Sequence, residues 1–269
     1  MPHVQSSYSR FLPFGRFHRS YGEISDVCIK RKIRNRMQDM GENIFVKSND
    51  RNDDEFDNLS DRASKTITKY TSIDDYARQA CATWTDVRAF GQVFAFKKDK
   101  KKEQESVSVG VRGPVSICQA KSLDPLNINS MQITKSVNGE PNEKGGKTSD
   151  TMGMKHFAEF GLYVIKGSIN VKMAEKTGFS TEDASLIKEC LRTLFVNDAS
   201  SARPDGSMVV EKLCWWEHNN KIGQYSSAKV HKLLNIKLKE GKVIPSSIDD
   251  YDISVDELDG LKKEEIAGL

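Results

Sequence analysis

Five cations crowd one short segment of this sequence, between positions 30 and 36. Lysine and arginine side chains supply affinity for nucleic-acid phosphates whatever the base sequence. A solvated helix face is the plainer explanation of such a run. The cations that we consider as phosphate contacts are Lys30, Arg31, Lys32 and Arg34.

Two further segments could contact bases. Met131 stands among polar residues of an alternating segment, and an apolar side chain there could wedge between bases of a single strand. Tyr225 could stack on a base, although both residues, taken singly, fit a packing role better. His156 fits an inward-facing strand residue at least as well as an RNA contact. The other candidates for RNA contact are Arg88, Lys121, Gln132, Lys135, Gln224 and Ser226.

The signals for catalysis are weaker. No histidine pairs at ligand spacing with another histidine or a cysteine, so no zinc motif is predicted. No nucleophile elbow, P-loop or dinucleotide fingerprint occurs. The acids of segments 50–61 and 249–259 lie in polar runs, which is typical of solvated loops. We therefore expect a protein that is not an enzyme and needs no cofactor.

Composition is compatible with a polyanionic partner. The chain has 269 residues and a net charge of +3. The last 24 residues hold eight acids and two bases, so the rest carries 39 bases against 30 acids. Five cysteines without C-x-x-C spacing favour a reducing compartment, and apolar runs are too short to span a membrane. We expect a cytoplasmic protein with no membrane partner.

Periodicity predicts the elements that would position these residues. Ile29, Ile33 and Met37 form an apolar stripe between Ser25 or Asp26, which can cap a helix, and Gly41, which can end it. A second helix follows the cap at Ser180 or Thr181. We predict helices at 25–40, 73–84 and 180–195 and strands at 85–96, 154–166, 207–216 and 229–239. Residues 106–117 are predicted as a strand, a turn at Gly113-Pro114 and a second strand.

The order of these elements predicts a fold of the α+β class. It matches a ferredoxin-like, RNA-recognition-motif-like palm whose first strand is not evident. Within residues 119–153, the segment 128–137 alternates and reaches a hairpin-turn signal at Asn138-Gly139, but residues 140–150 offer no apolar alternation to pair with it. An extended, exposed β-arm, or thumb, with a flexible return, inserted between the middle strands, therefore fits better than a core hairpin.

Seven stretches, ordered along the chain, resemble one family, the backbone (large-repeat) subunit of type I-C CRISPR Cascade surveillance complexes. The similarity covers residues 21–240. The stretches are SDVCIKRKIRN (25–35), DVRAFGQVFA (86–95), SVGVRGPVSI (108–117), SMQITKSVNGE (130–140), SDTMGMKHFAEFGLYVIKGSIN (149–170), EKTGFSTEDASLIKECLRTLFVNDASSARPDGSM (175–208) and WWEHNNKIGQYSSAKVH (215–231).

The resemblance implies a non-catalytic subunit that polymerises along a CRISPR guide RNA, with a thumb that reaches the next copy and kinks the guide. The implied partners are the guide RNA, target DNA through the guide, neighbouring copies, other Cascade subunits and the helicase-nuclease. The four helix cations match guide-backbone contacts, and segment 121–150 matches the thumb, with Met131 and Gln132 near the kink.

The resemblance also predicts three regions. Residues 1–24 are atypical, because the family's first strand is missing from them, and we expect a shifted or wrongly started reading frame upstream. Residues 25–245 form the palm, with an insertion at 41–85 and the thumb at 119–153. Residues 246–269 form an acidic tail, solvated by default, with a partner contact as the minority view.

Two alternatives stay open. One is a metal-dependent ribonuclease that cuts target RNA at regular intervals, for which Asp50, Asp53 or Asp54 could serve. The other is a remnant that no longer assembles, which the atypical start would favour.

Overall fold

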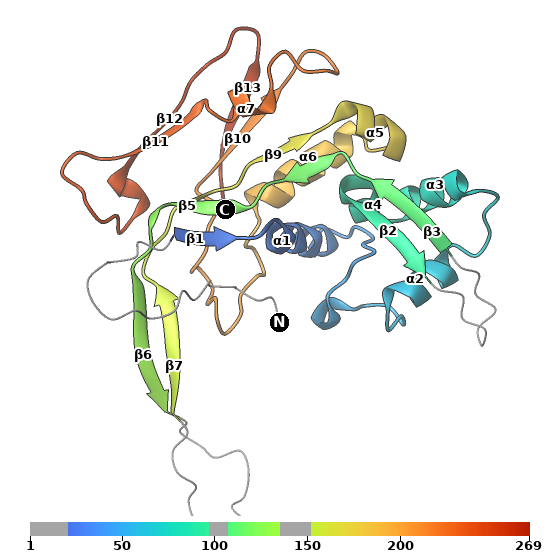
Figure 1. The fold of residues 1–269 in the computed structure, drawn as a ribbon, viewed down its shortest axis with the longest axis horizontal. Helices are drawn as coiled ribbons and strands as arrows, with labels where there is room; N and C mark the ends of the chain where they lie inside the picture. Colours follow the sequence, from blue (N-terminus) through green and yellow to red (C-terminus); the bar gives the residue numbers. More distant parts are fainter. Residues whose placement is uncertain (1–20, 97–106, 135–151) are drawn as a thin grey trace, which may run out of the picture. The chain divides into compact units, whose positions relative to one another are not determined.

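A computed structural model of the chain describes residues 21–96, 107–134 and 152–269 (Figure 1). The protein is of the mixed α+β class, as predicted, and its sheets are small and antiparallel. The chain forms two compact units. We name them the arm unit (residues up to 24, 120–164 and 235–254) and the helical unit (residues 25–119, 165–234 and 255–269).

The regular elements in the described part of the arm unit are strands and one 3-10 turn. Three of the strands form a sheet in the order β1-β5-β8, and β6 pairs with β7 and β11 with β12. The elements are β1 (Tyr21–Ile24), β5 (Ala120–Pro125), β6 (Ile128–Thr134), β7 (Met152–Ala158), β8 (Tyr163–Val164), β11 (Leu234–Leu238), the 3-10 turn η2 (Ile248–Asp250) and β12 (Tyr251–Val255).

The helical unit contains every α-helix of the described residues and three strand pairs, β2-β3, β4-β9 and β10-β13. Its elements are α1 (Asp26–Asp39), η1 (Asn49–Arg51), α2 (Leu59–Thr66), α3 (Ile73–Thr83), α4 (Thr85–Phe90), β2 (Gly91–Phe96), β3 (Val107–Arg112), β4 (Val115–Ile117), β9 (Gly167–Ile169), α5 (Val171–Thr177), α6 (Thr181–Arg192), β10 (Lys212–Glu217), α7 (Ser227–Val230) and β13 (Lys262–Ala267).

An aromatic cluster forms a core of the helical unit. Phe45 lies at its centre, with ring centroids 4.6 Å from Trp84 and 5.1 Å from Phe94. Tyr76 packs on Phe94 with centroids 5.3 Å apart. Aromatic pairs at these separations add stability beyond the apolar area that they bury. The cluster therefore fixes α3, α4 and β2 around segment 43–46.

The predicted helices at 25–40, 73–84 and 180–195 are all present. The last, α6, begins with the predicted cap at Ser180, which forms a reciprocal capping box with Asp183. Its buried face includes Ile187 and Cys190. Capping and apolar spacing are local signals, which explains why the sequence predicts these elements well.

Residues 85–96 are predicted as one buried strand, but they form α4 followed by β2. The chain changes conformation at Gly91, whose φ of +79° few other residues adopt. α4 buries Val87 and Ala89 together with the carboxylate of Asp86. The prediction of a single strand over 85–96 is therefore wrong.

Other predicted strands are shorter than expected. Residues 154–166 are split into β7 and β8, and at Gly161 a Cβ atom would come within 2.7 Å of Leu126. Residues 229–239 begin with the end of α7 and continue as β11. The predicted strand at 207–216 corresponds to β10, which starts later.

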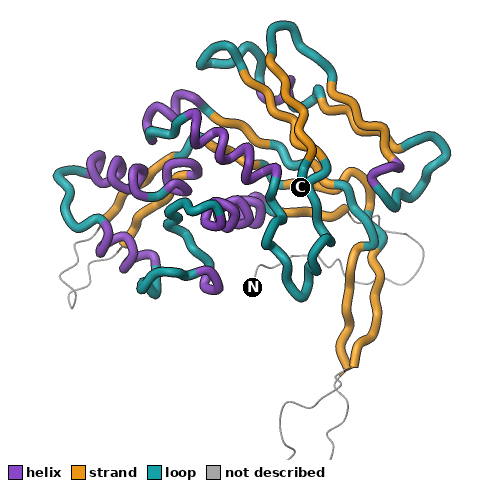
Figure 2. Tube along the Cα trace, turned by 180° about the vertical axis from the view of Figure 1, so that it is seen from behind, coloured by secondary structure: helices purple, strands orange, loops and turns teal. Residues whose placement is uncertain are grey.

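The two ends of the described chain also differ from expectation. Residues 21–24 form β1, which pairs with β5, so a short strand does precede α1. Residues 246–269, predicted as an acidic tail, contain η2, β12 and β13. In β12 the exposed Asp252 stands between the buried Tyr251 and the partly buried Ile253, so one side of that strand packs, whereas Glu264 and Glu265 of β13 are adjacent and both exposed. Figure 2 shows β13 beside β10 and β12 beside β11.

Candidate nucleic-acid interface

Helix α1 is the element that carries the predicted phosphate contacts. It begins after Ser25, whose side chain accepts a hydrogen bond from the backbone N–H of Cys28 at 3.2 Å. Its buried stripe is Ile29, Ile33 and Met37, as the spacing predicts. The cations share the remaining faces of the helix, and most of these faces are also covered by the helical unit.

Arg34 is held by a buried carboxylate. Its Nε donates to Oδ2 of Asp86 at 2.8 Å, and its guanidinium carbon lies 5.0 Å from the centre of the Phe90 ring. Asp86 is fully buried and also accepts from the backbone N–H groups of Phe45 at 2.7 Å and Val46 at 3.2 Å. Arg34 therefore neutralises the carboxylate that anchors segment 43–46 to α1.

The neighbouring cations also point into the unit. Arg31 Nη1 donates to the carbonyl oxygen of Val46 at 2.6 Å, and burial, followed by the charge of Arg34, lowers the pKa of Arg31. Lys32 is only 5% exposed and forms an ion pair with Asp198. Burial of a charge requires such pairing. These cations thus have structural partners in place of phosphates.

Lys30 is different from its neighbours in α1. Its Nζ lies 3.1 Å from Oδ2 of Asp26, one helical turn earlier, and its side chain is 26% exposed. An ion pair of this kind at the surface is weak and readily exchanged for another anion. Lys30 is therefore available to a phosphate in a way that Lys32 is not.

Arg88 on α4 forms a bidentate pair. Its Nε and Nη2 donate to the two carboxylate oxygens of Asp183 at 2.8 and 2.7 Å, and Nη1 donates to the carbonyl oxygen of Cys81 at 2.7 Å. The hydrogen bonds to Asp183 raise the pKa of Arg88. Arg88 thus joins α4 to the first turn of α6.

The predicted β-arm is formed by the β6–β7 pair (Figure 1). Met131, 49% exposed, stands opposite Lys155, and Gln132 stands opposite Met154. Adjacent strand residues point to opposite faces, so Met131 and Gln132 lie on different faces of the ribbon. Figure 2 shows the two strands from the other side. Lys135 lies outside the described residues.

The exposed side chains of Ser130, Gln132 and His156 form hydrogen bonds within the ribbon. Ser130 Oγ lies 2.7 Å from Nδ1 of His156, its cross-strand partner. The Gln132 amide nitrogen lies 2.7 Å from the sulfur of Met152. His156 is therefore an outward-facing residue, and the expectation of an inward strand histidine is wrong.

Lys121 lies on β5 of the arm unit and is exposed. Its Nζ is 4.8 Å from the centre of the Tyr21 ring on β1, which stands beside it in the sheet. A cation–π contact at an exposed site is worth about 0.5–1 kcal/mol. That contact leaves the ammonium group open to solvent and to a phosphate.

The predicted base-stacking segment has a structural role. The Gln224 amide donates to the carbonyl oxygen of Gly260 at 2.9 Å, and Tyr225 Oη donates to the carbonyl oxygen of Asp259 at 2.9 Å. Ser226 caps α7 by accepting from the backbone N–H of Lys229. Gln224 and Tyr225 therefore fasten their loop to the chain that leads into β13. Lys229 also lies over the Tyr225 ring, 4.5 Å from its centre.

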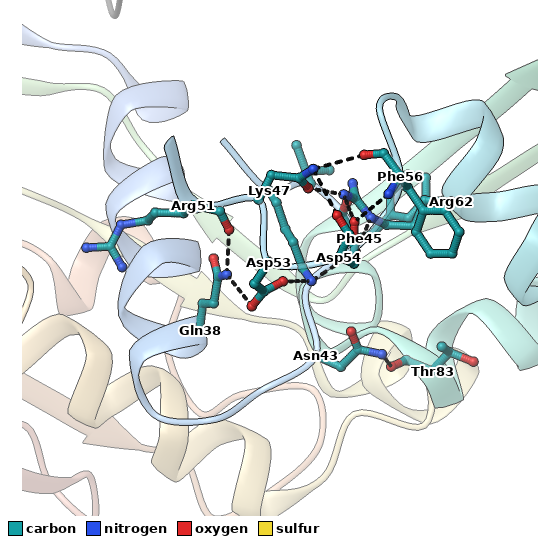
Figure 3. Close-up of polar contacts among 12 residues, drawn as sticks. Gln38, Asn43, Phe45, Lys47, Arg51, Asp53, Asp54, Phe56, Arg62 and Thr83 are labelled. Carbon is teal, nitrogen blue, oxygen red and sulfur yellow. Dashed lines mark hydrogen bonds and ion pairs between the residues drawn. The ribbon is translucent and has the colours of Figure 1, made fainter. Parts of the chain in front are cut away.

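Two acids of segment 48–62, Asp53 and Asp54, form ion pairs with neighbouring cations (Figure 3). Asp54 accepts from Arg62 Nη2 at 2.7 Å and from Lys47 at 3.0 Å, and the hydrogen bonds from Arg62 are the main reason that its pKa is lowered. Asp53 pairs with Lys47 and accepts from Gln38 at 2.9 Å, which together lower its pKa.

Asp50 is the third acid considered for metal-dependent chemistry. The nearby Ser48 side chain is the largest cause of the lowered pKa of Asp50. Across the described residues, no group of three or more histidine, cysteine or acidic side chains is arranged to hold a metal ion.

Sequence reasoning missed the most exposed part of the candidate interface. Met152, Met154 and Phe157 on β7 are 65%, 58% and 39% exposed, although Met154 and Phe157 stand in the segment predicted as a central strand. The turn signal at Asn138-Gly139 was the available clue, because a hairpin arm needs a second strand after its turn.

Comparison with known proteins identifies the family to which the chain belongs. The profile of the family described as CRISPR-associated protein Cas7 matches residues 16–256, and the chain belongs to that family. A curated relative from Haloferax volcanii, named CRISPR-associated protein Cas7, is 28% identical over 188 residues, which cover 64% of this chain. The match covers 54% of that relative, so the chain spans about half of its length.

A solved structure described as a CRISPR RNA-guided surveillance complex, pre-nicking, has a chain that is similar to this one with a TM-score of 0.34 and 12% identity. The match covers 68% of this chain and 66% of the other. Within the described ranges, none of the helices combines the length and apolarity that a bilayer crossing requires.

Proposed function

We propose that this protein is a non-catalytic backbone subunit that binds CRISPR guide RNA and polymerises along it in a type I-C surveillance complex. The observation that carries the proposal is the Cas7 family match over residues 16–256. The type I-C assignment rests on the seven sequence stretches named above. The solved surveillance complex adds no support, because a TM-score of 0.34 is too low to carry an argument.

The proposed fold is an RNA-recognition-like palm with the β6–β7 arm as its thumb. Support comes from the order of the elements, in which helices α1 and α6 alternate with antiparallel strands. The proposed partners are the guide RNA, target DNA paired to the guide, neighbouring copies, other subunits and the helicase-nuclease of a cytoplasmic complex.

We assign to RNA the candidate residues whose polar or charged side-chain groups are accessible to solvent. Gln132 and His156 are exposed on one face of the arm, and their donors and acceptors can bond to bases or riboses. Lys121 and Lys30 are the candidate cations with accessible ammonium groups. Arg31, Lys32 and Arg34 would act indirectly, because they hold segment 43–46 and Asp198 against α1.

The proposal that the subunit is non-catalytic rests on the ion pairs that Asp53 and Asp54 form. Asp53 and Asp54 are paired with Lys47, and Arg62 also holds Asp54. A carboxylate that binds a catalytic metal must give up such partners, which costs free energy. A role as scaffold and RNA reader fits this arrangement better than a role in metal-dependent cleavage.

Gel shifts and native mass spectrometry on single-stranded RNAs of increasing length, with and without magnesium, test the proposal. We expect stepwise addition of subunits as the RNA lengthens, strong salt dependence and intact RNA. Cleavage at a regular spacing only with magnesium, lost in Asp54→Ala, would establish the ribonuclease alternative instead. A folded monomer without RNA affinity would indicate a remnant.

A further inference from the structure

The register of β6 and β7 gives the arm two chemically different faces. Cross-strand partners share a face, so Ser130 with His156 and Gln132 with Met154 lie on one side. Met152 lies on the same side, because alternate residues of a strand point the same way. We call the side that carries these five residues the mixed face.

Three groups that bind soft metal ions follow one another along the mixed face. They are the thioethers of Met152 and Met154 and the imidazole of His156, at every second position of β7. Second neighbours along a strand lie about 7 Å apart, so side chains that lean toward Met154 from both directions can reach one ion. Thioether sulfur selects soft ions such as Cu(I), and imidazole is also a ligand of copper.

Both thioethers are open to solvent. Met152 and Met154 are 65% and 58% exposed, and they are the most exposed methionines among the described residues. An ion can therefore reach the sulfur atoms without displacing packed side chains. An apolar partner on this face would instead take the Gln132 amide and the His156 imidazole out of water, which costs free energy.

Cross-strand contacts already direct the ligand groups. The Gln132 amide nitrogen lies 2.7 Å from the Met152 sulfur, and Gln132 is the cross-strand partner of Met154. The Met152 thioether therefore leans along the ribbon toward Met154. Ser130 Oγ lies 2.7 Å from Nδ1 of His156. A hydrogen bond to one ring nitrogen determines that the other nitrogen, here Nε2, binds a metal.

The charge of the mixed face also suits a cation. Lys155 is the one charged residue in the sequences of β6 and β7. It stands opposite Met131 and belongs to the other face of the ribbon. A cation bound by Met152, Met154 and His156 would therefore share its face with no like charge from these two strands.

We propose that Met152, Met154 and His156 form a binding site for a soft monovalent metal ion, Cu(I), on the mixed face of the arm. The donor set is two thioether sulfurs and one imidazole nitrogen, without an oxygen. Mg²⁺ and Ca²⁺ prefer oxygen ligands, so the site discriminates against them. Ser130 is a positioning residue, because its hydrogen bond orients the His156 ring.

Methyl NMR of the chain labelled with ¹³C-methyl methionine tests the site, with Ag(I) as an air-stable probe for Cu(I). The chain carries Cys28→Ser and Cys118→Ser, which remove the two thiols that are neither buried nor paired with a raised pKa. Burial raises the pKa of the other three thiols, which keeps them protonated. We expect one equivalent of Ag(I) to shift the methyl signals of Met152 and Met154 and to leave that of Met131 unchanged.

Variants assign the signals and measure each contribution. Met152→Leu with Met154→Leu should abolish binding of Ag(I) to the arm, whereas Met131→Leu, the matched control on the opposite face, should bind as the parent does. Ser130→Ala should weaken the affinity about tenfold, because an outer-shell partner of a ligand is worth at least that factor. Cu(I) under anaerobic conditions should shift the same two signals, and Mg²⁺ should shift none.

The opposite results overturn the site. A shift at Met131 as large as those at Met152 and Met154 would show unspecific binding to exposed thioethers. An affinity for Ag(I) that the double leucine variant retains would place the ion elsewhere. Melting temperatures from circular dichroism should be equal for all variants, since the substituted side chains are exposed. The titrations contain no RNA, so their result does not depend on the proposed function.

Discussion

Helix α1 and the β6–β7 arm both carry residue types that bind nucleic acid, yet their side chains have opposite surroundings. In α1, Lys32 and Arg34 are buried or nearly so, and each is paired with a carboxylate. In the arm, Gln132 and His156 are exposed and contact only neighbours within the ribbon. A cluster of cationic residues in the sequence therefore does not distinguish a phosphate site from an internal network of salt bridges. The exposure of the side chains does distinguish them.

The comparison predicts that variants of α1 lose stability and variants of the arm lose RNA affinity. Burial decides the size of each effect, because removal of one partner from a buried ion pair leaves an uncompensated charge. An exposed side chain can be removed with little effect on folding.

The largest effect is expected for Asp86→Ala. It removes the acceptor of Arg34, Phe45 and Val46, and breaking a buried pair of this kind costs about 3–5 kcal/mol. Urea denaturation of the purified chain measures the loss. Asp26→Asn, which breaks the exposed pair with Lys30, is the control and should change stability by less than about 1 kcal/mol. Equal losses would contradict the contrast.

The double variant Gln132→Ala with His156→Ala should weaken binding to a short RNA by about tenfold. Each lost hydrogen bond is worth about 0.5–1.5 kcal/mol, and the residues are exposed, so unfolding should shift by less than about 0.5 kcal/mol. Fluorescence anisotropy with labelled RNA gives the affinity, and Ser185→Ala on α6 serves as an exposed control. Unchanged affinity would remove Gln132 and His156 from the interface.

A smaller effect distinguishes Lys121 from Lys32. Lys121→Ala should lower the slope of log affinity against log salt by about 0.7, the amount for one phosphate contact on a single strand, and leave stability nearly unchanged. Lys32→Met should destabilise the fold and leave that slope as it is, because Lys32 is paired with Asp198. Salt titrations of the two variants measure this difference. The opposite result would place the phosphate contact on α1.

The smallest expected effect is on the stability of the fold at acidic pH. Hydrogen bonds from Arg62 hold the pKa of Asp54 below its ordinary value in the folded chain. A group with a lowered folded-state pKa stabilises the fold above the ordinary pKa near 4, and that contribution is lost as the pH falls further. The wild-type urea midpoint should therefore fall more steeply below about pH 4 than that of Asp54→Asn. Parallel curves would show that the Arg62 pair contributes nothing.

Local signals made the helices predictable from sequence. The caps at Ser25 and Ser180 and the stripes that follow them lie within a few residues, so α1 and α6 were found. The switch at Gly91 and the strands at 251–267 depend on partners far along the chain, such as β10 for β13. Their acidic composition favoured a solvated tail, and pairing with β11 and β10 makes them strands.

The position of the candidate site along the arm was predictable from sequence. Whether each candidate cation faces solvent or pairs inside the fold was not. Alternation placed Met131 and Gln132 on an extended strand, and that prediction is confirmed for the described residues. Sequence could not show that Lys32 would meet Asp198 or that Arg88 would meet Asp183, because these pairs join segments 166 and 95 residues apart. The cations were therefore assigned to RNA although the fold itself provides their counter-charges.

Ultraviolet crosslinking of the assembled complex, followed by mass spectrometry of RNA-linked peptides, tests the central claim most directly. We expect crosslinks within residues 128–158, including His156, with the peptide of residues 26–39 free of them. Crosslinks concentrated in residues 26–39 of a chain with its native melting temperature would contradict the assignment of RNA contact to the arm.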